Sequence, residues 1–130
     1  MENLYDNTPG VKELKTKDLV KKSDGNVLIG DNDFRNKVYL MVFYAPWCGH
    51  CVRMSDDIKK LGGALKDEGF MVGAINCDAN DDLDSKIIIN SFPTLYFVKD
   101  EKVVKYDGQR DLQSLLNHLC DTLGKCLRRK

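Results

Sequence analysis

The stretch that decides the fold is residues 38–51, which read VYLMVFYAPWCGHC. Residues 38–44 are all apolar or aromatic, which is typical of a strand buried on both faces in the middle of a sheet. Pro46 then interrupts the strand, because proline cannot donate a hydrogen bond to the sheet. A helix is predicted to follow, since apolar residues recur at helical spacing: Cys51, Met54, Ile58, Leu61 and Leu65. Cys48 therefore lies where a buried strand passes into an amphipathic helix.

Other segments extend this pattern in both directions along the chain. We expect further strands over 11–14, 70–75, 94–98 and 102–106, and short helices over 16–22 and 81–88. Residues 23–26 read as a turn, and the polar residues 99–101 make the last two strands an antiparallel hairpin. Asp111 can cap a last helix that carries an apolar stripe to Leu123. This alternation predicts an α/β fold with a mixed central sheet flanked by helices on both faces.

Composition and charge limit the classes of function. The chain has 130 residues, and its 20 basic and 20 acidic residues give a net charge of zero. This excludes a strong electrostatic footprint for nucleic acid or an anionic membrane, and no apolar run approaches the roughly 18 residues of a membrane-spanning helix. We expect a flexible N-terminal arm over 1–10, one domain over 11–124 and a basic tail over 125–130, either merely solvated or attractive to nucleic acid.

The pair Cys48 and Cys51 carries the predicted chemistry. At a helix N-terminus, free backbone N–H groups and the macrodipole lower the pKa of a thiol from about 8.5 by one to several units, which favours the nucleophilic thiolate. Cys51 lies on the same helical face and can attack a mixed disulfide formed at Cys48. Gly49 keeps the turn small, and a partial positive charge on His50 would make the disulfide a stronger oxidant. The pair therefore predicts thiol–disulfide exchange.

The remaining cysteines leave alternatives open. Zinc is the competing interpretation of Cys48 and Cys51, but a structural site needs about four ligands and the chain has no second pair at ligand spacing; we expect no metal and no bound cofactor. Cys77 reads as a core or strand-end thiol, or as a redox group. Cys120 and Cys126 can form a disulfide only if the last helix ends near Gly124, and such a pair could pass electrons to Cys48 and Cys51.

At this point the sequence resembles the thioredoxin superfamily. Residues 43–51 are similar to the active domains of protein disulfide isomerase, residues 92–94 to the cis-proline loop, and residues 106–110 to the turn before the last helix. The resemblance implies a thioredoxin fold, in which Cys48 is the nucleophile and Cys51 the resolving cysteine. It also implies substrate contacts by four residues near the disulfide, with Pro93 in the cis form: Trp47, Gly49, Phe92 and Pro93.

The resemblance further implies that Arg110 approaches the resolving cysteine and lowers its pKa; a solvated arginine beside Asp111 is the alternative. Two departures alter the expected chemistry. Val42 occupies the position of the family's buried acid, and Ala74 that of its lysine partner. Replacing both with apolar residues spares the fold a buried unpaired charge, but we expect slower attack by Cys51. Val52 in place of a lysine removes a positive charge, and Asp56 in place of a proline predicts a straighter helix.

Three functions fit these residues. The first is an oxidase or isomerase that forms or reshuffles protein disulfides, the second a thioredoxin-like cytosolic reductase, and the third a client-binding module with weak redox activity. The expected partners are proteins with thiols or disulfides, together with an upstream oxidase, a reductase or glutathione, and we expect a monomer. The start and end of the chain carry no secretory or retention signal. If these termini are natural, the location is cytoplasmic or particle-associated; if a leader was removed, it is the endoplasmic reticulum lumen.

Overall fold

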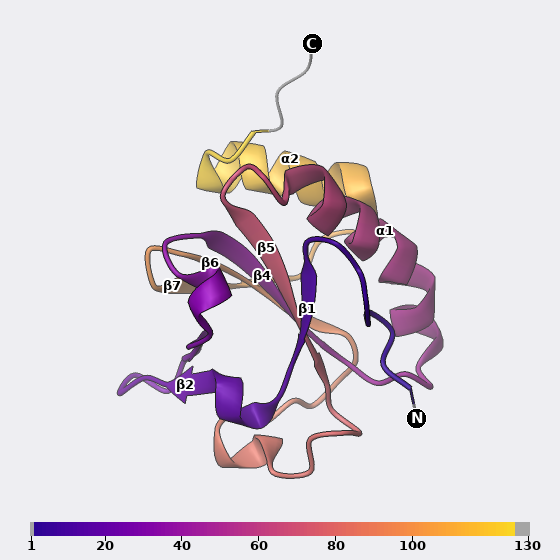
Figure 1. Cartoon of the computed structure of the whole chain (residues 1–130), viewed down its shortest axis with the longest axis vertical. Helices are drawn as coiled ribbons and strands as arrows, with labels where there is room; N and C mark the ends of the chain where they lie inside the picture. The colour runs from indigo at the N-terminus through magenta and orange to yellow at the C-terminus, as the bar shows by residue number, and fades with distance from the viewer. Residues whose placement is uncertain (1, 127–130) are drawn as a thin grey trace.

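A five-stranded mixed sheet in the order β1-β5-β4-β6-β7 forms the centre of the computed structural model, which describes residues 2–126 (Figure 1). Its strands are β1 (Val11–Leu14), β4 (Val38–Tyr44), β5 (Phe70–Asn76), β6 (Thr94–Lys99) and β7 (Lys102–Tyr106). β1, β5 and β4 are parallel, whereas β6 and β7 run antiparallel to their neighbours. The predicted mixed sheet, with β4 in its middle, is confirmed.

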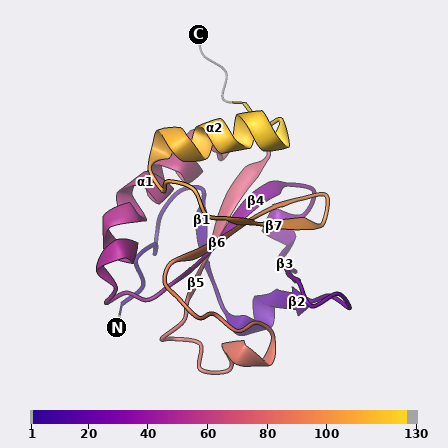
Figure 2. The same ribbon diagram turned by 180° about the vertical axis from the view of Figure 1, so that it is seen from behind.

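Both α-helices cover the same face of this sheet (Figures 1 and 2). They are α1 (Gly49–Leu65) and α2 (Leu112–Leu123), and their apolar stripes share one core with the strands. The Asp111 carboxylate accepts the Ser114 N–H at 2.9 Å, which confirms the predicted cap of the last helix. Gly124 ends α2 with a φ of 66°, a left-handed conformation that favours glycine. No helix within residues 2–126 is long and apolar enough to cross a membrane.

On the opposite face of the sheet the helical elements are only short 3-10 helices. A hairpin of β2 (Leu19–Lys21) and β3 (Val27–Ile29) covers it, with three single 3-10 turns: η1 (Thr16–Asp18), η2 (Asn32–Phe34) and η3 (Leu83–Ser85). The helix expected over 16–22 is wrong, because the turn at 23–26 folds Leu19–Lys21 back onto β3. The helix expected over 81–88 is reduced to η3, since consecutive β-branched isoleucines favour extended backbone.

The N-terminal residues contradict the expectation of a flexible arm over 1–10. The Tyr5 side chain is fully buried, and the Leu4 N–H donates to the Tyr44 hydroxyl at 3.0 Å. Gly10 has a φ of 78° and crosses so close to α1 that a Cβ there would collide with the Gly62 carbonyl. Gly62 therefore admits the arm against α1, and the helix continues past it to Leu65. The arm is part of the core that surrounds the end of β4.

Candidate active site

The start of α1 holds two free thiols of unequal exposure. Cys48 is the N-cap residue of α1 and is half-buried, whereas Cys51, one turn later, is fully buried. The loop that follows β4 is closed by a hydrogen bond from the Cys48 N–H to the Ala45 carbonyl at 3.0 Å, and the Val52 N–H then donates to the Cys48 carbonyl at 3.0 Å. The sequence prediction that both cysteines lie at a strand–helix junction is confirmed.

The surroundings shift the pKa values of these thiols in opposite directions. The Cys51 N–H is the largest of the influences that lower the pKa of Cys48, and the His50 N–H, the Cys51 thiol and the charge of Arg53 add to it. The pKa of Cys51 is raised to about 11, mainly by burial and with a contribution from the neighbouring Cys48. The positive charge of Arg110 opposes this increase, and the closer approach of Arg110 to Cys51 that the resemblance implies stays a prediction. The site therefore pairs an accessible, readily ionised thiol with a buried one.

Arg53 is a site residue that the sequence interpretation missed. Its guanidinium lies 3.0 Å from Nδ1 of His50, and since a guanidinium only donates, that nitrogen accepts. His50 therefore acts on Cys48 through its backbone N–H, and the side-chain charge near Cys48 comes from Arg53. A Cβ on Gly49 would approach the Arg53 guanidinium to 3.2 Å, so the glycine leaves room for it. The signal in the sequence was a cation one helical turn beyond His50.

The loop before β6 brings the predicted substrate-contact residues beside Cys48. The Phe92–Pro93 peptide bond is cis, as predicted, and the Phe92 carbonyl accepts a hydrogen bond from the Cys48 thiol at 3.7 Å. The Trp47 ring meets the Phe92 ring edge-on at 6.0 Å and is 59% exposed. An open groove of about 410 Å³ continues from Phe92 along Cys77 and residues 87–89. Phe92 thus connects the accessible thiol to a groove that both apolar residues and the acidic Asp81 and Asp84 line.

The positions of the missing acid and its partner face each other in the sheet. Val42 on β4 and Ala74 on β5 are register partners, and both are fully buried in the core that contains Cys51. Neither Val42 nor Ala74 places a charge in this core, as the sequence predicted. The partly buried carboxyl of Glu13, on β1, accepts hydrogen bonds from the Tyr44 hydroxyl and from the Tyr5 N–H. Burial raises the pKa of Glu13 to about 7.

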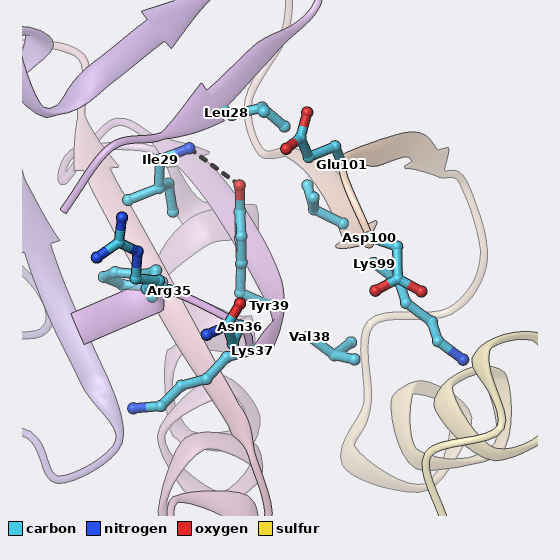
Figure 3. Close-up of a pocket in the computed structure, with 12 residues that line it drawn as sticks. Leu28, Ile29, Arg35, Asn36, Lys37, Val38, Tyr39, Lys99, Asp100 and Glu101 are labelled. Atoms are coloured by element: carbon cyan, nitrogen blue, oxygen red, sulfur yellow. Dashed lines mark hydrogen bonds between the residues drawn. The ribbon is translucent and has the colours of Figure 1, made fainter. Parts of the chain in front are cut away.

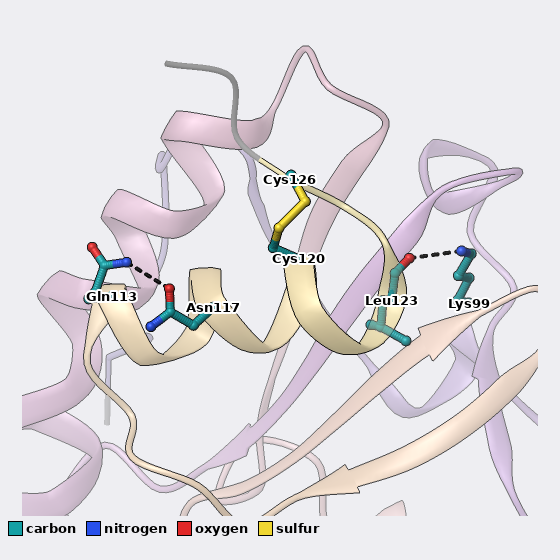
Figure 4. Close-up of a disulfide and its surroundings, with 6 residues drawn as sticks. All are labelled: Lys99, Gln113, Asn117, Cys120, Leu123 and Cys126. Atoms are coloured by element: carbon teal, nitrogen blue, oxygen red, sulfur yellow. Dashed lines mark hydrogen bonds between the residues drawn. A yellow bond between two sulfur atoms is a disulfide. The ribbon is translucent and has the colours of Figure 1, made fainter.

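Of the other cysteines, Cys77 feels the charge of Cys51, whereas Cys120 and Cys126 are paired with each other. Cys77 follows β5, its thiol contacts the Ile75 carbonyl at 3.8 Å, and burial raises its pKa to about 12, as expected of a strand-end thiol. Cys120 and Cys126 form a disulfide with a Cα–Cα distance of 4.2 Å around Gly124 (Figure 4).

The Cys120–Cys126 disulfide lies near the C-terminal end of α1, whereas Cys48 lies at its N-terminal end. Lys125 approaches Gly69, which follows the C-terminal end of α1, and the 17 residues of α1 span about 25 Å. We therefore expect no direct exchange between the disulfide and Cys48, and the idea that Cys120 and Cys126 pass electrons to the site stays untested.

Two further features lie outside the cysteine pair. A pocket of about 520 Å³ lies at the opposite end of β4 from Cys48, where Arg35, Lys37 and Lys99 mix with Asp100 and Glu101 (Figure 3). In the part of the chain that the structure describes, no group of three or more metal-ligating side chains is present. His118 instead stacks on Phe97 at 4.8 Å, as part of the packing beneath α2.

Fold and site together define a domain of the thioredoxin class with two thiols at a helix N-terminus. The thioredoxin family model matches residues 17–121. The chain is 37% identical over 122 residues to protein disulfide-isomerase 1 of Dictyostelium discoideum, covering 85% of this chain and 34% of that protein. It is 33% identical over 119 residues to protein disulfide-isomerase A3 of Gallus gallus, covering 83% of this chain and 23% of that protein. The chain thus spans about a third or less of these relatives.

A solved structure agrees with these matches. The first thioredoxin domain of mouse protein disulfide-isomerase A4 superposes with a TM-score of 0.55 at 28% identity, covering 76% of this chain and 75% of that one. The J-Trx1 fragment of ERdj5 gives a TM-score of 0.62 at 23% identity, over 86% of this chain and 51% of that fragment, which supports the fold alone. The chain belongs to the thioredoxin family, as a domain homologous to domains of protein disulfide isomerases.

Proposed function

We propose that this chain forms or reshuffles disulfides in client proteins, through mixed disulfides at Cys48 that Cys51 resolves. The observation that carries the proposal is the asymmetry of the two thiols: Cys48 is accessible with a lowered pKa, and Cys51 is buried with a raised one. A thiolate attacks, and the thiol with the lower pKa is also the better leaving group. One turn of helix thus supplies both an attacking and a resolving sulfur.

The exchange balances without any cofactor. In the reductive direction, the Cys48 thiolate attacks one sulfur of a client disulfide, the client S–S bond breaks, and the second client sulfur leaves as a thiolate. Cys51 then loses its proton to solvent and attacks the sulfur of Cys48, which forms the Cys48–Cys51 disulfide and releases the first client thiolate. The client gains two electrons and the pair loses two. Oxidation of a client dithiol follows the same steps in reverse.

Groups around the pair support the oxidising direction. The backbone N–H groups of Cys51 and His50, with the charge of Arg53, all stabilise the Cys48 thiolate. Because the thiolate exists only in the reduced enzyme, they favour the reduced form and make the disulfide the stronger oxidant. Trp47 and Phe92, with Gly49 and Pro93, form the surface on which an extended client segment would lie.

A second function, that of a client-binding module with weak redox activity, is favoured by one observation. The apolar residues Val42 and Ala74 lie in the same core as the buried Cys51. If Cys51 ionises slowly, a client attached to Cys48 stays attached, and the domain retains clients more than it turns them over. A cytosolic reductase remains the third function, and it requires a thioredoxin reductase as electron donor.

Refolding of scrambled ribonuclease and reduction of insulin separate these functions. Isomerisation of ribonuclease without a reductase supports the proposed function. Insulin reduction that requires thioredoxin reductase favours the reductase. Client binding that persists in Cys48→Ser, with neither activity in the wild type, contradicts the proposal and leaves the binding module.

A further inference from the structure

The groove that leads away from Phe92 is a surface that the exchange chemistry does not itself require. It is formed by segment 77–93, which joins β5 to β6 at the same end of the sheet as the start of α1 (Figure 1). Phe92 belongs to both the groove and the site, because its carbonyl accepts a hydrogen bond from the Cys48 thiol. A client segment that continues past Cys48 in this direction therefore enters the groove.

The apolar part of the groove is exposed to solvent. Leu83 and residues 87–89 line it together with Phe92. Ile88 is 72% exposed, more than any other large apolar residue within 2–126. Trp47, which meets the Phe92 ring edge-on, is exposed as well. An aliphatic side chain of a client that covered Ile88 or Trp47 would remove apolar surface from water and would be held there by the hydrophobic effect.

The charged part of the groove is acidic. Asp81 and Asp84 are exposed and line it, and its described lining contains no basic residue. Within residues 2–126, neither aspartate forms an ion pair. Lys86 is the single basic residue of segment 77–93, and its ammonium group donates to the Thr16 carbonyl at 2.8 Å. The segment therefore does not neutralise the negative charge of its own groove.

The fold of this segment does not explain the two aspartates. The Asn80 amide donates to the Asn76 carbonyl at 2.8 Å and accepts the Thr16 N–H at 3.1 Å. These buried hydrogen bonds hold the segment against β5 and the turn that begins at Thr16 without the carboxylates of Asp81 and Asp84. Both carboxylates are therefore available to a charged group that enters the groove from solvent.

We infer that this groove selects client segments in which lysine or arginine lies close to the reacting cysteine, with Asp81 and Asp84 as the residues that determine the preference. The inference rests on the proposed function, because it names the class of client that Cys48 attacks. The occupant is an extended segment that carries three features: a cysteine at Cys48, an aliphatic side chain over Ile88 and a basic side chain beside the two carboxylates.

The groove acts on binding and encounter, and the exchange step itself stays the same. The Cys48 thiolate attacks the client S–S bond, that bond breaks, and the second sulfur leaves as a thiolate. Carboxylates beside the path of the client attract a basic segment and repel an acidic one, which raises the rate of encounter for the first and lowers it for the second.

The expected preference is moderate, because exposed charges interact weakly in water. An exposed ion pair contributes up to a factor of about five. A client lysine is attracted by two carboxylates, and a glutamate in its place is repelled, so their rate constants should differ roughly tenfold at low ionic strength. At about 1 M salt the Debye length falls to about 3 Å, and most of the preference should disappear. A preference of the wild type that persists undiminished at this salt concentration overturns the inference.

The main test compares three peptides that share a leucine–cysteine–leucine core and are flanked on both sides by lysine, glutamine or glutamate. Each peptide cysteine is in a disulfide with mercaptoethanol, which carries no charge. The reduced full chain is mixed with each peptide, and acid quenching with mass spectrometry gives the rate constant. The wild type should react fastest with the lysine peptide and slowest with the glutamate peptide. Equal rate constants for the three peptides overturn the inference.

Two double variants assign the preference to the groove. Asp81→Asn with Asp84→Asn should bring the lysine-to-glutamate ratio to within about twofold of unity, since the attraction and the repulsion are both removed. Asp81→Lys with Asp84→Lys should reverse the order of the peptides, which a general loss of structure would not do. An order that stays as in the wild type in the lysine variant overturns the inference.

Asp67→Asn with Asp121→Asn is the matched control, because it makes the same change of net charge on exposed residues away from the groove. Asp67 follows the C-terminal end of α1, and Asp121 lies in the last turn of α2. This variant should keep the wild-type ratio. An equal loss of the ratio in the control and in the groove variant would mean that the total charge of the protein sets the preference, which overturns the inference.

A binding measurement separates this inference from the proposed function. Peptides with serine in place of cysteine are titrated into Cys48→Ser, and NMR follows the amide signals of residues 81–89. Tighter binding of the lysine peptide, with shifts in this segment, supports the inference even where the wild type exchanges no disulfide, and then the proposed function fails alone. Exchange at equal rates, or binding without shifts in residues 81–89, overturns the inference and leaves the proposed function standing.

Discussion

Glu13→Gln should remove a pH dependence of stability that the wild type shows between about pH 4.5 and 7. Burial raises the pKa of Glu13 from 4.5 to about 7, against the hydrogen bonds from Tyr44 and Tyr5 that lower it. Because the folded-state pKa is the higher one, the native state binds the proton more tightly than the unfolded state. The associated stability is fully present below pH 4.5 and is lost as the pH rises through 7.

The size of this loss follows from the shift. A shift from 4.5 to about 7 corresponds to about 3 kcal/mol at 1.36 kcal/mol per unit. Glu13 is only partly buried, so solvent screening reduces the expected loss to about 1 to 2 kcal/mol. Glutamine keeps an oxygen that can accept from the Tyr44 hydroxyl, and it has no charge to bury. The free energy of unfolding of Glu13→Gln should therefore vary less across this window.

Urea unfolding at several pH values between 4 and 8 measures the difference between the two proteins. Burial lowers the pKa of His118, so its contribution has the opposite sign: stability is lost at low pH and returns as the pH rises. The comparison with Glu13→Gln cancels that contribution, because His118 is present in both proteins. Parallel stability curves for wild type and variant, or a wild type that gains stability relative to the variant as the pH rises, would refute the reasoning.

Three further changes test separate parts of the site. Arg53→Ala should raise the pKa of Cys48, because it removes a charge that lowers this pKa. Alkylation of Cys48 near pH 6.5 should slow about twofold, the effect of roughly 0.5 kcal/mol between exposed charges. An unchanged rate would mean that Arg53 does not stabilise the Cys48 thiolate. Val42→Glu with Ala74→Lys should speed the release of clients from mixed disulfides several-fold in stopped-flow assays, and no gain would sink the explanation for slow resolution. Cys120→Ser should lower the free energy of unfolding by about 2 kcal/mol, the loop-closure term for a short loop, and leave the redox potential of the site unchanged; a shifted potential would contradict the separation of the two disulfides.

The centre of the fold could be predicted from the sequence because its patterns are local and strong. The unbroken apolar run of β4 and the helical spacing from Cys51 onward specify their elements without outside help. The junction that positions the two cysteines follows directly. The pairing of positions 42 and 74 followed from the family resemblance, and the parallel register of β4 and β5 places the two residues side by side.

The parts that were missed depend on contacts distant in the sequence. Leu19–Lys21 reads equally as a helix or a strand, and only its pairing with β3 decides. The arm over residues 2–10 is polar on average, so the burial of one ring, Tyr5, was invisible in its composition. Arg53 shows no motif of its own, and its role depends on the space that Gly49 leaves. Strand pairing decided the first of these features, and side-chain packing between distant residues decided the burial of Tyr5 and the role of Arg53.

The measurement that tests the central claim most directly is the equilibrium of Cys48 and Cys51 with a glutathione redox buffer, read by mass spectrometry of alkylated thiols. A reversible two-electron couple is predicted, nearer to about −180 mV than to about −270 mV, because the groups around Cys48 favour its thiolate. Cys77→Ser, which removes the remaining free thiol of the described chain, should give the same value. Failure to form the Cys48–Cys51 disulfide reversibly would contradict the account, and a couple near −270 mV would contradict its oxidising direction.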